Sequence, residues 1–339
     1  MTDAPPEPPP DLRSERRRLA GALGAALLLA LAAYFLVEST LGRDGGSGAV
    51  TLTFLLAVPA GLSAFVALLG DLRGTKGLGH YLTVPFALTL LAILAGAVFL
   101  REGVICILML APFWLVGGLI GSLAVGALRK QLRGRGRMHA SAALLLPLLA
   151  AQVEASLPVP EGRYEVRREV VIAAPPERVW PLLASIPAVR AEEGRWNVAQ
   201  DLLGIPRPTG AKLVRRGGDL VREAQWGPQI RFEEAISAVR PGAALEWRFH
   251  FPDGSVREHT DRHIAPDGAH LGIETGAYRL APLPGGRTRL TLETRYRLRS
   301  PVNGYAAWWG GLLLGGIQDN VLAIVRDRAE AGARGGPAA

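Results

Sequence analysis

His259, Asp261 and His263 have the residue types and the spacing of a metal site. Two imidazoles and a carboxylate can bind zinc or iron, and residues two apart on a strand share one face of a sheet. Val256 and Ile264 fall on the opposite face of this predicted strand, so that face is expected to be the buried one. The histidines and the aspartate then lie on the solvated side, and we expect neither a metal nor another cofactor.

The same alternation turns Glu258, Thr260 and Arg262 toward the interior of the domain. A charged side chain loses its hydration there and needs a partner. Two interpretations stay open for Glu258 and Arg262. They form a structural ion pair with each other, or they orient the polar end of a bound ligand.

An aromatic set is predicted to face that interior as well. Ligand sites are mostly apolar with a few polar anchors, so this set could line a cavity, and it could equally form an ordinary core. The sequence lacks the nucleophile elbow, the phosphate loop, the dinucleotide fingerprint and the zincin motif, so we assign no catalytic residue. The aromatic set is Trp247, Phe249, Tyr296, Tyr305 and Trp308.

Residues 163–331 have the pattern of the sheet that these side chains require. Apolar and polar residues alternate from Tyr164 to Ile172, and Pro175 or Pro176 can then start a short helix. Further alternating runs follow, separated by turn signals. The turn signals are Gly217-Gly218, Pro241-Gly242, Asp253-Gly254, Asp267-Gly268 and Gly285-Gly286. Strands joined in this way predict an antiparallel sheet with one apolar face.

A long helix is predicted from Asn303 to Glu330, with its apolar side against the sheet. Gly310, Gly311, Gly315 and Gly316 lower its helix propensity by roughly 1 kcal/mol each and leave room beside the backbone. Such room between helix and sheet is what a ligand cavity needs.

This order of elements, with the segment from Ile172 to Leu183 at the first strand-to-helix junction, resembles the SRPBCC superfamily. That group includes START-type lipid-transfer domains, polyketide cyclases and the birch-pollen allergen. The resemblance covers residues 163–331 and implies a helix-grip fold, an α+β domain in which a curved antiparallel sheet wraps a long C-terminal helix around a hydrophobic cavity.

A narrower resemblance links the chain to a family of bacterial multi-span membrane proteins that carry such a domain. It rests on the segment from Glu102 to Ile107 with Pro112, on the segment from Gly204 to Pro208, and on the tail from Trp308 to Glu330. The sequence departs from that pattern at Gly310-Gly311, where a polar, acidic helix face is more usual.

The first half of the chain is predicted to be a bundle of four or five transmembrane helices. Hydrophobic residues make up 49% of the sequence and charged residues only 20%, which argues against a wholly soluble protein. Four apolar runs, each near the roughly 20 residues that cross a bilayer, lie within residues 19–128, at 19–37, 50–70, 81–100 and 104–128. Residues 1–18 and 332–339 are predicted to be disordered tails.

A basic loop and an ambiguous apolar segment fill residues 129–162. Residues 141–157 are apolar around Leu144 to Leu149 and are then interrupted by Gln152 and Glu154. As a fifth span this segment would place the second half outside the cytoplasm, and as an interfacial or re-entrant helix it would leave that half inside. We favour five spans and leave both open.

The distribution of charged residues predicts how the chain is oriented in a membrane and which partners it can bind. Basic residues gather at 13–18, 73–76 and 129–137, so the N-terminus is expected to be cytoplasmic, in a bacterial inner membrane. The net charge of +8 comes largely from arginines scattered among acids, which argues against nucleic-acid binding. Gly117 and Gly121 predict a close helix contact, either within the chain or in a homodimer.

Together these patterns predict membrane-tethered binding of a lipid or another hydrophobic or amphipathic small molecule, and its transfer stays open. Two alternatives stay open. One is a cyclase-like enzyme with Glu258 and Arg262 as its acid–base and binding groups, and the other is a regulatory or structural membrane subunit that holds a partner segment.

Overall fold

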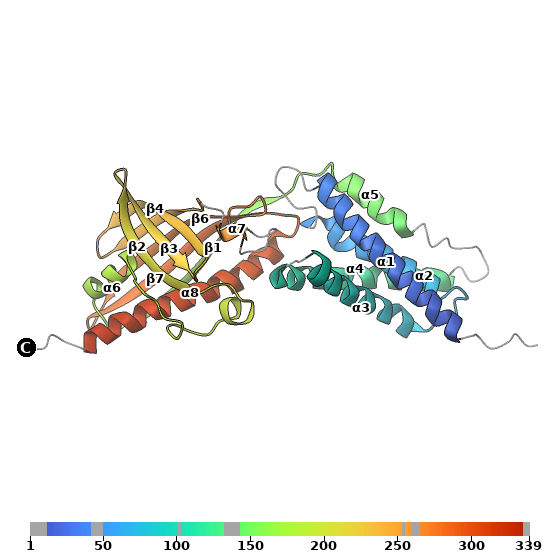
Figure 1. The fold of residues 1–339 in the computed structure, drawn as a ribbon, viewed down its shortest axis with the longest axis horizontal. Helices are drawn as coiled ribbons and strands as arrows, with labels where there is room; N and C mark the ends of the chain where they lie inside the picture. The colour runs from blue at the N-terminus through green and yellow to red at the C-terminus, as the bar shows by residue number, and fades with distance from the viewer. Residues whose placement is uncertain are drawn as a thin grey trace, which may run out of the picture. The chain divides into compact units, whose positions relative to one another are not determined.

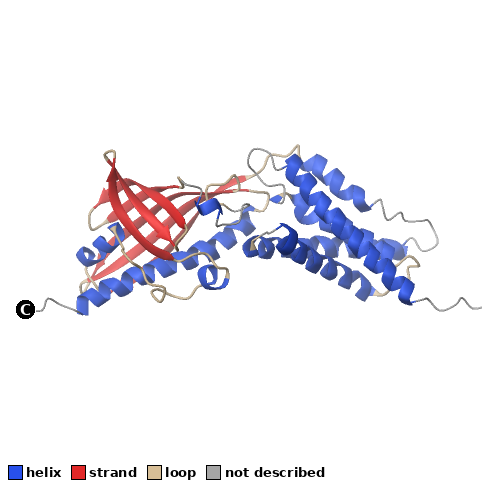
Figure 2. Ribbon diagram, viewed as in Figure 1, coloured by secondary structure: helices blue, strands red, loops and turns tan. Residues whose placement is uncertain are grey.

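Residues 12–41, 50–100, 103–131, 143–252, 255–258 and 265–334 are described by the structure, a computed structural model. The chain divides into two units, Met1–Pro158 and Val159–Ala339. Figure 2 shows that the first unit is built from helices and the second from a sheet with helices against it. The predicted pairing of a helical bundle with an α+β domain is confirmed.

The helical unit contains helices that match the predicted apolar runs. In chain order they are α1 (Leu12–Leu41), η2 (Thr53–Ala57), α2 (Val58–Gly70), α3 (Leu78–Ala95), η3 (Gly96–Leu100), α4 (Val104–Gln131) and α5 (Leu145–Glu154). Within the described part of the chain, four stretches are long and apolar enough to cross a bilayer, namely Arg17–Ser39, Thr53–Gly70, Leu78–Val98 and Val104–Gln131.

Helix α1 begins earlier than the sequence pattern indicates. It starts at Leu12, so residues 12–18, which were expected to belong to a disordered tail, are helical. Most of these residues are Leu, Arg or Glu, which are good helix formers, and a helix that already exists in the apolar run extends through them at little cost.

Helix α5 is shorter than the fifth transmembrane helix that the sequence predicts. It is ten residues long, which gives about 15 Å at 1.5 Å per residue, half the thickness of a bilayer's apolar layer. Pro147 lies in its first turn, where a missing N–H is tolerated. Residues 155–157, predicted to be part of the span, lie beyond the end of the helix. The segment 141–157 is therefore not a full-length transmembrane helix.

Gly117 and Gly121 of α4 are both buried against η2 and α2 of the same chain. A Cβ at Gly117 would lie within 3.1 Å of Pro59 and of the Leu56 backbone, and one at Gly121 would overlap the backbone of Ala60. The small side chains thus serve close packing of α4 on η2 and α2.

The second unit is a seven-stranded antiparallel sheet with the strand order β1-β7-β6-β5-β4-β3-β2. Its strands are β1 (Glu161–Ile172), β2 (Pro208–Arg216), β3 (Asp219–Trp226), β4 (Ile230–Arg240), β5 (Ala244–His250), β6 (Leu271–Leu283) and β7 (Arg287–Arg299). Its helices are α6 (Pro176–Ala184), η5 (Val198–Leu202), α7 (Ser255–Glu258) and α8 (Asn303–Arg334).

Helix α8 runs along the sheet, packs on β1 and β7, and also contacts α6 and η5 (Figure 1). This arrangement is the predicted helix-grip fold. The turns fall where glycine allows them, since Gly217, Gly218, Gly242, Gly285 and Gly286 all have positive φ.

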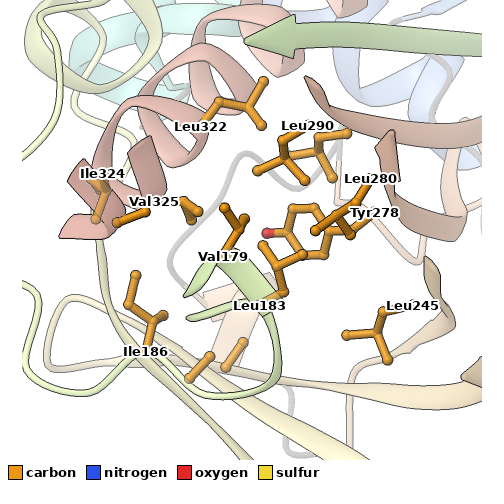
Figure 3. Close-up of a cluster of buried hydrophobic side chains, with 14 of the residues drawn as sticks. Val179, Leu183, Ile186, Leu245, Tyr278, Leu280, Leu290, Leu322, Ile324 and Val325 are labelled. Atoms are coloured by element: carbon orange, nitrogen blue, oxygen red, sulfur yellow. The ribbon is translucent and has the colours of Figure 1, made fainter. Parts of the chain in front are cut away.

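The core lies between the sheet, α6 and α8 (Figure 3). Val179 and Leu183 of α6 and Leu322 and Val325 of α8 are at most 2% exposed. The predicted start of α6 is also confirmed, because Pro176 occupies its first turn. Apolar side chains thus fill the space between helix and sheet.

One predicted strand is wrong over its described part. Ser255–Glu258 form the short helix α7, although the alternation of Val256 with Ile264 suggested a strand. Val256 is buried as expected, but against the sheet from a helical turn. An alternation of apolar and polar residues over so short a segment fits a strand or a helical turn. Tertiary packing then determines which of the two forms.

Candidate functional site

The predicted aromatic set is divided among three places. Trp247 is 2% exposed and lies in the main core with the partly buried Phe249. Tyr296 lies in a separate small cluster with Val166 and Leu298. Tyr305 stacks on Trp308 near the start of α8, and Trp308 is 62% exposed. One cavity therefore does not gather all five rings.

The predicted polar residues are only partly placed. Glu258 ends α7, whereas Arg262 lies outside the described residues, as do His259, Asp261 and His263. Across the ranges that the structure describes, no group of three His, Cys, Asp or Glu side chains is arranged to hold a metal ion.

A buried ion pair that the sequence analysis missed lies on the inner face of the sheet. Arg222 of β3 is directly opposite Glu234 of β4 in the strand register. Their side chains are 6% and 7% exposed, and Arg222 Nη1 donates to Glu234 Oε2 at 2.5 Å. The guanidinium carbon also lies 6.0 Å from the ring centre of Tyr278 on β6.

Trp247 borders this pair. Its ring centre is 5.1 Å from that of Tyr278, so the ion pair and the indole both lie close to the same tyrosine. Gly276 is the register partner of Trp247 on β6, and a Cβ there would overlap the indole ring. Glycine at this position lets the indole lie against the strand backbone.

Two N–H groups at this place have no acceptor. Arg222 Nε and Trp247 Nε1 are both buried and form no hydrogen bond within the protein. More than 90% of buried polar groups in proteins are satisfied, so two unpaired donors near one tyrosine are unusual. They could both donate to an oxygen atom of a bound molecule.

Burial sets the protonation of the site. Desolvation raises the pKa of the Glu234 carboxyl, and the adjacent Arg222 guanidinium opposes this rise. Desolvation also raises the pKa of Tyr278 to about 12. Tyr278 is therefore neutral at physiological pH, and we take the short pairing with Arg222 to keep Glu234 ionised, so that the pair has no net charge.

We call this cluster of Arg222, Glu234, Trp247 and Tyr278 the inner polar site. Figure 3 shows Tyr278 among apolar side chains from α6 and the sheet, with Val179 and Leu183 close to it. The arrangement offers hydrogen-bond donors in apolar surroundings, and this combination orients amphipathic ligands in proteins.

A second buried polar cluster is fully paired and holds the loop before β2 on α8. Asn320 is completely buried, and its Oδ1 accepts from Arg195 N at 2.7 Å. Its Nδ2 donates to Gln200 Oε1 at 2.7 Å. Because these groups bond to one another, this cluster explains how the loop is fixed and offers no open donor for a ligand.

The glycines of α8 do not leave the space that was expected. A Cβ at Gly310 would lie 2.5 Å from Tyr296 Oη, and one at Gly315 would overlap the Arg168 guanidinium. Asn197 lies beside Gly316. Protein side chains occupy the room next to these three glycines, and of the four that were expected to leave room only Gly311 faces open space.

Comparisons with known proteins extend only to the fold. No family model matches the chain, and no curated protein matches it. Among solved structures, the Zhui aromatase/cyclase from Streptomyces sp. R1128 is 17% identical, with a TM-score of 0.33, over 51% of this chain and 98% of that one.

Two further solved structures are similar to the chain at comparable levels. Truncated norcoclaurine synthase from Thalictrum flavum is 12% identical, with a TM-score of 0.30, over 50% of this chain and 97% of its own. The di-domain protein BexL of the BE-7585A biosynthetic pathway is 13% identical, with a TM-score of 0.31, over 62% of this chain and 63% of its own. At these identities the likeness concerns the fold alone.

Proposed function

We propose that this chain is a membrane-tethered binding protein, whose helix-grip domain takes up a hydrophobic or amphipathic small molecule, such as a lipid, at the inner polar site. The observation that carries the proposal is the pair of buried, unpaired donors, Arg222 Nε and Trp247 Nε1. A buried donor without an acceptor costs about 1–3 kcal/mol, and ligand oxygens that accept from these donors would remove that cost.

The surroundings define the class of ligand. Phe249 packs beside Trp247, and Phe232 packs on Phe249, so the body of the ligand must be apolar. Since Arg222 is already neutralised by Glu234, an uncharged acceptor such as a carbonyl or ester oxygen fits better than a free carboxylate. Apolar side chains fill this interior, so they must move apart when the ligand enters.

The experiment compares two tryptophan variants of the full chain, purified in nanodiscs of native lipid. Trp247→Phe keeps the apolar ring and removes the donor, and we expect it to lower the stoichiometry of a co-purifying small molecule, detected by mass spectrometry, about tenfold. Trp226→Phe is the matched control, because Trp226 belongs to the same aromatic cluster through Phe232 and Phe249 but its nitrogen is not an unpaired buried donor. Equal loading of wild type and Trp247→Phe would contradict the proposal.

We also infer which side of the membrane the domain occupies, from the path of the chain within the helical unit. Arg129, near the end of α4, lies 3.8 Å from Asp71, at the end of α2. The chain next reaches the middle of α2, where a Cβ at Gly61 would lie 2.8 Å from Ala143 O. Glu154 then accepts hydrogen bonds from Leu52 N and Thr53 N, at the start of η2.

This path supports a crossing from one end of the bundle to the other between Gln131 and Glu154. Helix α5 completes the second half of that crossing, so a full-length fifth helix is not required. Because basic residues gather at the Arg129 end, that end is cytoplasmic in our proposal, and the helix-grip domain lies on the other side of the membrane.

Reporter fusions test this topology. Alkaline phosphatase fused after Arg334 should be active, and the same reporter fused after Gln131 should be inactive. Green fluorescent protein at the two positions should give the reverse result. Fluorescence from the fusion after Arg334 would show that the domain lies in the cytoplasm and would overturn this placement without touching the ligand proposal.

A further inference from the structure

The helix-grip domain exposes large apolar side chains around the first half of α8. Trp308 and Leu312 lie one helical turn apart and are 62% and 38% exposed. Trp196, shortly before η5, and Leu202, its last residue, are 70% and 68% exposed. Surface tryptophans and leucines gathered in one region mark a contact with a partner or a membrane.

Contacts within the domain keep these side chains in the same region. Asn197, which follows Trp196, lies beside Gly316, one turn after Leu312. Asn197 O accepts a hydrogen bond from Asp201 N, which closes one helical turn. Leu202, the residue after Asp201, is therefore held about one turn from Asn197. We call Trp196, Leu202, Trp308 and Leu312 the exposed apolar patch.

The aromatic character of the patch favours the interfacial layer of a bilayer. Trp308 stacks on Tyr305 and forms an edge contact with Trp309, at ring-centre distances of 6.4 and 5.4 Å. Tryptophan and tyrosine are enriched where a protein meets the headgroup region, because their rings are apolar and carry a polar group.

Chain connectivity keeps the start of α8 within reach of the membrane. Pro160 O accepts from Asn303 Nδ2 at 3.0 Å and from Ser300 N at 3.1 Å, so α8 begins beside the start of β1. Pro160 follows shortly after Glu154, whose carboxylate accepts a hydrogen bond from Thr53 N at the start of the spanning segment Thr53–Gly70. At roughly 3.5 Å per residue, the intervening chain can extend about 20 Å at most.

We propose that the exposed apolar patch rests in the interfacial layer of the same bilayer that holds the four spanning helices. The occupant is lipid rather than a protein, because the tether keeps the start of α8 close to a membrane and because aromatic rings dominate the exposed area near it. This inference rests on the membrane tether of the proposed function and is independent of any ligand at the inner polar site.

Site-specific fluorescence tests the proposal on the full chain. Trp308→Cys, made in a Cys106→Ser background, is labelled with bimane and reconstituted in phosphatidylcholine nanodiscs that carry a nitroxide near the headgroup. Asp327→Cys is the matched control, because Asp327 lies on the same helix and its side chain is 53% exposed. Gly304→Cys, one helical turn before Trp308, is a second probe beside the patch, and it should not disturb folding because a Cβ there meets nothing within 4 Å.

We expect nitroxide lipid to quench the labels at 308 and 304 at least twofold more than the label at 327. Equal quenching at all three positions, or none at any, overturns the proposal. Labels at 308 and 304 that are shielded from aqueous iodide but not quenched by nitroxide lipid also overturn it, because a protein or a second copy would then cover the patch. None of these results depends on whether a small molecule is bound.

Discussion

Arg222 and Glu234 face each other across neighbouring strands in the interior of the sheet, where each residue is 5% exposed. The pair is held by a direct hydrogen bond from Nη1 of Arg222, while Nε of the same guanidinium has no partner in the protein. Burying two charges costs more hydration than their attraction usually returns, so stability alone does not explain the pair. The role proposed above, orienting a polar group of a ligand, would explain it.

Removing one partner should damage the domain severely. Arg222→Met leaves the Glu234 carboxylate buried without a counter-charge, and we expect the free energy of unfolding to fall by about 3–5 kcal/mol. Differential scanning fluorimetry of the full chain should show this loss as a lower melting temperature of the helix-grip domain.

Removing both partners should separate stability from function. The double variant Arg222→Met/Glu234→Leu replaces the pair with apolar side chains, and we expect it to regain most of the stability lost by the single variant. It should still fail to co-purify a small molecule. A double variant that carries as much ligand as the wild type would show that the pair serves packing only.

Glu193 should make the free energy of unfolding of the domain dependent on pH. Arg328 donates to its two oxygens at 2.7 and 3.0 Å, and this hydrogen bonding lowers the pKa of Glu193 to about 2. A carboxyl with a depressed pKa stabilises the folded state fully above its unfolded pKa, near 4.5, and loses that contribution as the pH falls toward 2.

Glu193→Gln should therefore destabilise the domain by about 2–3 kcal/mol at pH 7 and by much less near pH 3. Melting temperatures recorded from pH 7 to pH 3 measure the difference. Its neighbour provides the control, since Glu192 is 72% exposed and lies 3.8 Å from Arg190. Glu192→Gln should change stability by less than about 0.5 kcal/mol at either pH. A matching loss in both variants would contradict the assignment.

The strands and the final helix could be predicted from the sequence because alternation and turn glycines are local signals. The strand from Glu161 to Ile172, the turns at Gly217-Gly218 and Gly285-Gly286, and the helix from Asn303 all lie where the pattern indicated. The helical bundle was predictable for the same reason, since a run of about 20 apolar residues leaves few alternatives.

The site was harder to predict because it depends on register. The sequence analysis favoured Glu258 and Arg262, which are close in sequence, whereas the observed pair lies on two strands joined by the turn at Gly227-Pro228. One signal was available. Arg222 and Glu234 each interrupt an apolar face, between Leu220 and Ala224 and between Phe232 and Ile236, and they are equally distant from that turn. Opposite charges so placed predict a cross-strand pair.

Glu154 should hold α5 against the bundle. Its carboxylate accepts from Leu52 N and Thr53 N at 2.6 and 2.7 Å, and these N–H groups at a helix start otherwise lack acceptors. Glu154→Ala should increase hydrogen exchange at 145–154 and at 52–55 by about tenfold, as expected for a loss of 1–2 kcal/mol. Gln152→Ala changes an exposed side chain of the same helix and should leave both segments protected.

Two adjacent glycines of α8 should respond oppositely to alanine. A Cβ at Gly311 meets nothing within 4 Å, so Gly311→Ala gains helix propensity and should stabilise the domain by up to about 1 kcal/mol. A Cβ at Gly310 would lie 2.5 Å from Tyr296 Oη, and Tyr296 is itself 2% exposed and stacked on Tyr164.

Gly310→Ala should therefore displace α8 from the sheet locally and cost about 1–3 kcal/mol in spite of the same gain in propensity. Melting temperatures of the two variants, measured side by side in the full chain, give the sign of each effect. If Gly310→Ala stabilised the domain as much as Gly311→Ala, the close approach of Tyr296 to α8 would be wrong, and the expected free space beside this glycine would be restored as a place for a ligand.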